Sequence, residues 1–138
     1  ATGGPVKYLN SEVVAVSVKV GGEMCVPKDD LLWREVTVEV PAGQPAQVDL
    51  RLLNTGEAAW ACAATAAGKP GAVRLIEVMT GKPLAEISAD VPRHGETALR
   101  LELERTPEAG QERGTTVQLE AAGRCCFGQV ITLRLRGR

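Results

Sequence analysis

The single histidine, His94, is the first residue that could carry acid–base chemistry. It lies in the segment Pro92–Glu96, whose proline and glycine are typical of a turn between strands. A hydrolase nucleophile needs a base and an oxyanion site around it, and the sequence contains no Gly-x-Ser-x-Gly or comparable partnering motif. We therefore interpret His94 as an exposed turn residue, available to a binding surface, and predict that the domain is not an enzyme.

Four cysteines are the next candidates for chemistry. Cys125 and Cys126 are adjacent, so on a strand their side chains point to opposite faces and are poorly placed to hold one metal ion. No Cys-x-x-Cys motif or second histidine completes a zinc site. Two main interpretations stay open: buried free thiols that act as small apolar groups, or a sheet-to-sheet disulfide from Cys62 to Cys125 or Cys126. A metal site is the least favoured reading.

The acidic residues do not form a recognisable active site. Glu102 and Glu104 lie on the same strand face as Arg100, which is typical of a solvated surface with cross-strand ion pairs. Asp29–Asp30 is too small a cluster for calcium, and Gly21–Gly22 lacks the lysine and helix of a phosphate-binding loop. We expect no metal and no cofactor.

Length, composition and charge narrow the class of protein further. A chain of 138 residues is the usual size of one domain, and its hydrophobic fraction of 44% fits a globular protein. The net charge of −1 argues against nucleic-acid binding, which needs a basic surface to displace counterions from phosphates. No run of about 18 apolar residues is present, so we predict no membrane insertion.

Apolar and polar residues alternate with a period of two along much of the chain. Val36, Val38 and Val40, for example, are separated by Thr37 and Glu39. This spacing puts apolar side chains on one face of a strand, whereas a helix needs repeats of three and four. Strands are expected at 13–20, 35–40, 47–53, 60–66, 72–79, 84–89, 97–104, 115–121 and 127–136.

Clusters of glycine, proline and asparagine fall between these runs, as in Asn54–Gly56 and Pro41–Gly43. Strands and turns that recur about every ten residues are typical of a sandwich or barrel. We predict one all-β domain over 1–138, with about eight or nine strands in two packed antiparallel sheets. Residues 1–11 are expected to be a flexible N-terminal segment and 21–34 a long connection.

The connection carries the residues that most resemble an interaction anchor. Glu23–Leu32 lacks periodicity, so it either crosses from one sheet to the other or is a solvent loop; a short helix from Asp29 to Trp33 is a further option. Three large apolar residues end it, which either extend the core or form an exposed anchor for a partner protein. The candidate partner-binding residues are Leu31, Leu32, Trp33 and His94.

The segment from Val48 to Trp60 resembles a known family. A strand, the Asn54–Gly56 turn and a tryptophan four residues after its glycine are similar to the four-tryptophan (FW) domain of selective-autophagy cargo receptors and some bacterial proteins. Val91–Glu96 and the run from Phe127 through Leu135 are similar to later parts of that domain, so the resemblance covers about 36–136. Of the family's four tryptophans only Trp60 is present; Leu50, Val117 and Ile131 stand where the others are expected.

The resemblance implies an immunoglobulin-like antiparallel β-sandwich and protein recognition without catalysis. We therefore expect a non-catalytic protein–protein interaction module, one part of a larger protein or assembly, whose partner the sequence does not identify. Binding would use a free sheet edge or the loops at one end of the sandwich. The alternative is a secreted or cell-surface structural spacer, which a disulfide would favour.

Overall fold

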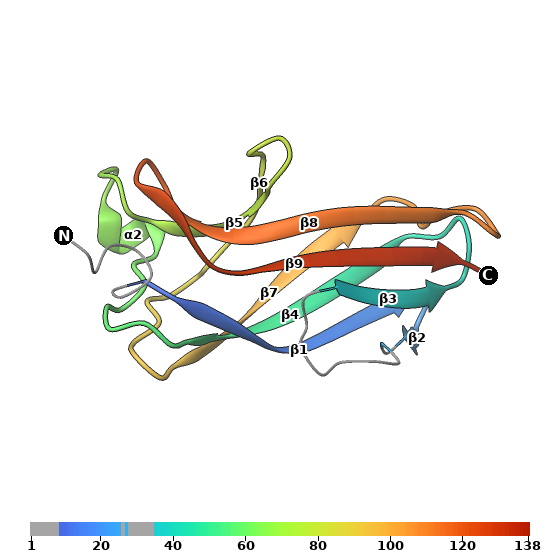
Figure 1. The fold of residues 1–138 in the computed structure, drawn as a ribbon, viewed down its shortest axis with the longest axis horizontal. Coiled ribbons are helices and arrows are strands. Elements are labelled where there is room, and N and C mark those ends of the chain that lie inside the picture. The colour runs from blue at the N-terminus through green and yellow to red at the C-terminus, as the bar shows by residue number, and fades with distance from the viewer. Residues whose placement is uncertain (1–8, 26, 28–34) are drawn as a thin grey trace.

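The computed structural model describes residues 9–25, 27 and 35–138, and the chain forms two β-sheets packed face to face (Figure 1). The first sheet consists, in spatial order, of β2 (Glu23–Cys25), β1 (Ser11–Val20), β4 (Ala46–Asn54) and β7 (Glu96–Leu103). The second consists of β3 (Glu35–Val40), β9 (Cys125–Gly137), β8 (Glu112–Ala121), β5 (Val73–Glu77) and β6 (Pro83–Glu86). A short helix, α2 (Ala63–Ala66), lies at one end.

The predicted all-β sandwich is confirmed. Its strand order is that of an immunoglobulin-like fold, with β1, β4 and β7 in one sheet and β9, β8, β5 and β6 in the other. The strand pairs are antiparallel except β3–β9, which run parallel with Glu35 opposite Thr132. The parallel pair arises because the chain leaves the first sheet after β2 and joins the free side of β9 in the second.

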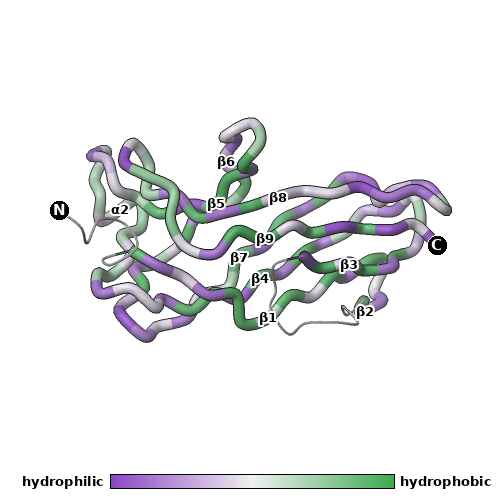
Figure 2. Tube along the Cα trace, in the orientation of Figure 1, coloured by the Kyte–Doolittle hydropathy of each residue, from purple (hydrophilic) through white to green (hydrophobic). Residues whose placement is uncertain are grey.

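The two-residue alternation of the sequence reappears as alternating burial. In β3 the three valines are buried and the residues between them are exposed. Figure 2 shows apolar and polar positions alternating along β3 and β9. The core between the sheets includes Leu50, Leu75, Leu119 and Ile131, each 2% exposed or less. Burial of these apolar side chains is the main force that holds the sheets together.

The predicted strand at 60–66 is wrong. Trp60 and Ala61 make isolated bridges, to Val91 and Ala72, and the chain then turns into α2. Three of the four residues of α2 are alanine, which loses little conformational freedom in a helix, so the segment accepts this conformation. Ala67 ends the helix in the left-handed conformation, with φ of 51°.

The predicted connection 21–34 contains a strand, β2, which the sequence did not reveal. Gly21 and Gly22 have φ of 56° and 85°, and this pair of positive angles makes the tight turn that joins β1 to β2. Because β2 is in the first sheet and β3 in the second, the chain does cross between sheets after Cys25. The predicted helix from Asp29 to Trp33 lies outside the described residues.

The predicted flexible segment 1–11 extends too far, since Ser11 is buried and begins β1. Residues 1–8 lie outside the described part of the chain. Within that part, no helix has the length and apolar character needed to cross a lipid bilayer.

Candidate functional site

Asn54 holds together one end of the sandwich. Its side chain is fully buried; Oδ1 accepts a hydrogen bond from the Gly56 amide, and Nδ2 donates to the carbonyl oxygens of Ala58 and Val91, each at 3.0 Å. The Val91 backbone also exchanges two hydrogen bonds with Trp60. The predicted turn therefore joins three segments of the chain.

Trp60 belongs to the core. It is 0% exposed, and its ring lies 5.8 Å from that of Phe127 at an interplanar angle of 59°. Tilted aromatic pairs of this kind stabilise a core beyond the area they bury. Trp60 is therefore a structural residue and offers no surface to a partner.

His94 is an exposed turn residue, as the sequence predicted. It adopts φ of 67°, and its amide donates to the Asn54 carbonyl at 2.9 Å. This left-handed backbone conformation is uncommon outside glycine, but histidine, like asparagine and aspartate, adopts it more often than other residues, and here it lets the chain turn back into β7. Leu31, Leu32 and Trp33 lie outside the described residues, so the anchor predicted there stays a prediction.

The four cysteines are free thiols in the structure. Cys25 and Cys62 are buried, Cys125 is half-buried and Cys126 is exposed. Burial raises the pKa of Cys25; the pKa of Cys126 is raised by desolvation first and then by Glu120 and Cys125. A raised pKa keeps a thiol protonated and weakens it as a nucleophile. No group of three potential metal ligands occurs among the described residues.

Asp90 is a structural residue that the sequence did not single out. Its Oδ1 accepts a hydrogen bond from the Cys62 amide and its Oδ2 one from the Thr65 hydroxyl, both at 2.9 Å. These bonds, the Cys62 amide first, lower the pKa of the Asp90 carboxyl. The carboxylate thereby satisfies the first turn of α2, where Cys62 itself gives no side-chain cap.

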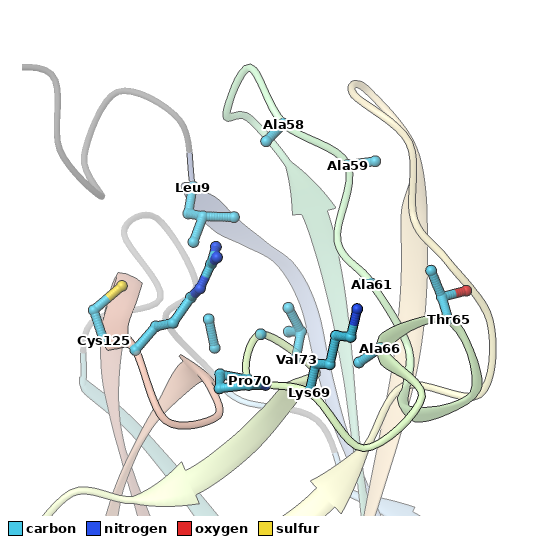
Figure 3. Close-up of a pocket in the computed structure, with 13 residues that line it drawn as sticks. Leu9, Ala58, Ala59, Ala61, Thr65, Ala66, Lys69, Pro70, Val73 and Cys125 are labelled. Atoms are coloured by element: carbon cyan, nitrogen blue, oxygen red, sulfur yellow. The ribbon is translucent and has the colours of Figure 1, made fainter.

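A pocket of about 540 Å³ lies beside α2, between the loop that carries the helix and the β8–β9 turn (Figure 3). Much of its wall is small and apolar, including Ala58, Ala59, Ala61 and Ala66. Lys69 and Arg124 also line it, and neither forms an ion pair with another described residue. Such a lining suits a small anionic group.

A second cavity, of about 530 Å³, opens between the two sheets where β6 and β7 form their edges; we call it the β7 groove. Its apolar lining consists of Val48, Leu84, Leu101, Leu103, Leu133 and Leu135. Charged residues of both signs complete it: Glu77, Lys82, Glu102, Glu104, Arg105 and Arg113. Arg105 pairs with Glu108, and the other five have no ion-pair partner among the described residues.

The free side of β7 adjoins this groove. β7 is the edge of the first sheet, so one row of its backbone N–H and C=O groups pairs with no strand of the described chain. In immunoglobulin constant-type domains, a further strand occupies this position. Arg100 and Asp49 form a cross-strand ion pair at 3.0 Å, of the general kind expected for this strand face. The alternation revealed β7 as a strand but carried no signal that it would be an edge.

No protein-family model matches the chain, and a search of curated proteins finds no significant match.

Proposed function

We propose that this domain is a non-catalytic protein–protein interaction module that binds an extended segment of its partner along β7. The observation that carries the proposal is the free edge of β7 beside the β7 groove. An unpaired edge offers backbone hydrogen bonds, and an adjoining apolar groove offers a place for side chains.

The mode of binding follows from strand geometry. An added strand forms backbone hydrogen bonds with β7, and every second side chain of that strand points toward the interior of the sandwich. There it meets Leu84, Leu101 and Leu103, which are at least partly buried. Charges of both signs surround this groove, which favours a segment that itself carries charges of both signs.

Two features support a role without catalysis. His94 is exposed on a turn, with no described thiol or hydroxyl in hydrogen-bond contact with its side chain. The exposed thiol of Cys126 has a raised pKa, the reverse of what activates a nucleophile. The resemblance to the FW domain points the same way, because that family recognises proteins without catalysing reactions.

Affinity capture from native extract tests the proposal. Leu103→Lys puts a charge at the β7 groove, while Val130→Lys makes the same kind of change on the exposed face of β9 and serves as a matched control. We expect the wild-type and Val130→Lys domains to retain the same partner, and Leu103→Lys to lose it with unchanged circular dichroism.

Trp33→Ala, captured in parallel, tests the sequence-predicted anchor as a second contact. If Leu103→Lys retains every protein that the wild type retains, binding does not use the β7 groove. If none of the domains retains a specific protein, the interaction-module proposal itself is contradicted.

A further inference from the structure

We infer that the strand added at β7 belongs to a second copy of this chain, so that two domains pair β7 to β7 in antiparallel orientation around a twofold axis at Leu101. This inference rests on the proposed function in one respect, since it uses the same sheet edge. The occupant of that edge is then a second copy of the chain, and the axis at Leu101 fixes the register of the pair.

β7 lacks three of the devices by which proteins protect their edge strands, namely short length, proline and a bulge. It is eight residues long, against three for β2, six for β3 and four for β6, the other edge strands. β6 also begins with Pro83, and its pairing with β5 is shifted by a bulge. β7 contains no proline, and its register with β4 is unbroken.

The charge pattern on the solvent face of β7 also favours pairing between two copies. With the axis at Leu101, Arg100 of each copy lies opposite Glu102 of the other, so two ion pairs form by symmetry. Glu102 has no ion-pair partner among the described residues, and Arg100 uses Nε for Asp49, which leaves its Nη groups available. β3, with Glu35 and Glu39 as the charges of its exposed face, would place like charges together.

Neighbouring registers fit less well. An axis at Arg100 puts arginine opposite arginine, and an axis at Leu99 puts Glu96 opposite Glu102. An axis at Ala98 pairs Glu96 with Arg100, but Glu96 already lies 3.9 Å from Arg51. That axis also leaves Leu103 outside the paired strands. Register in a sheet is set by such side-chain matches.

The inward face of β7 fits the same register. In the chosen register, Leu101 lies opposite Leu101 of the second copy, and Leu99 lies opposite Leu103 of that copy. Residues directly opposite in an antiparallel pair have their side chains on the same face, so these leucines meet on the core side. The two β7 grooves adjoin across the axis, and the half-buried Leu103 becomes covered.

Sedimentation equilibrium over a range of concentrations tests the inference on the whole chain. We expect the wild type to shift reversibly from monomer to dimer, and amide hydrogen exchange in β7 to slow as the dimer forms while that in β2 does not. A wild type that stays monomeric at all concentrations overturns the inference.

A charge exchange tests the register. Glu102→Arg and Arg100→Glu each put two like-charge pairs across the axis, and each weakens dimerisation roughly tenfold. An equimolar mixture of the two variants regains the ion pairs and should dimerise about as well as the wild type. Because Arg100→Glu also removes the contact to Asp49, thermal melts check that both variants fold.

The outcomes separate this inference from the proposed function. Recovery of the dimer on mixing supports the register, since damage to either fold would not be repaired by the other variant. Failure to recover overturns it. A monomeric chain whose Leu103→Lys variant still loses a captured protein overturns self-pairing alone, and a chain that neither dimerises nor captures any protein overturns both.

Discussion

Asn54 shows how much a single buried polar side chain can organise. The Asn-Thr-Gly motif indicates a turn, and the turn is present. The hydrogen bond from Nδ2 to the Val91 carbonyl, 37 residues further along, was not predictable from the sequence, because strand periodicity assigns faces and carries no information about long-range partners. The same limit applies to Asp90, whose partners lie 25 and 28 residues away.

Asn54→Ala should lower the free energy of unfolding by about 3 kcal/mol, because the Ala58 carbonyl and the Gly56 amide lose this partner and the buried Val91 carbonyl keeps only its bond from Trp60. Thr55→Ala, at the exposed neighbouring position, is the matched control and should change stability by less than about 0.5 kcal/mol. Urea unfolding monitored by circular dichroism measures both. Equal effects at the two positions would contradict the role assigned to Asn54.

Among the elements, the strands with clear alternation were predictable to within a few residues, as at β3 and β7. The segment after Trp60 was not, since a short mixed run of alanine, cysteine and threonine fits a strand or a helix equally well. What decides the outcome is tertiary: Trp60 pairs with Val91, and Asp90 then caps the turn that follows. Neither contact can be recognised from the local sequence.

The helix α2 should therefore respond to acid. The pKa of Asp90 is lower in the folded chain than its ordinary value of about 3.9, so its contribution is complete above that value and is lost as the pH falls through the lower folded pKa. Asp90→Asn removes this dependence. We expect the difference in melting temperature between wild type and variant to shrink as the pH is lowered from 7 to 3; a constant difference would show that the carboxylate does not titrate this way.

For the whole molecule, the sandwich followed from alternation and turns, whereas the arrangement of its edges did not. Which strand ends a sheet depends on the order of all the strands, and a local pattern does not encode that order. The β7 groove could therefore be recognised only from the folded structure. The anchor predicted at Leu31, Leu32 and Trp33 stays a prediction, to be decided by the Trp33→Ala capture.

The redox state distinguishes the interaction module from the alternative of an exported spacer. Because the structure has four free thiols, we expect all four cysteines to react with a thiol reagent under denaturing, non-reducing conditions. Mass spectrometry of the alkylated chain counts them. A count of two, with Cys62 linked to Cys125 or Cys126, would instead favour the spacer.

The parallel pairing of β3 with β9 has a consequence for how the chain reaches its native state. Glu35 lies opposite Thr132, far along the chain, so β3 pairs with β9 only when the C-terminal strand is available. Closing so large a loop is entropically costly, and folds dominated by distant pairings form slowly. During that interval the valine face of β3 is exposed to water, and the nascent domain is then most vulnerable to aggregation.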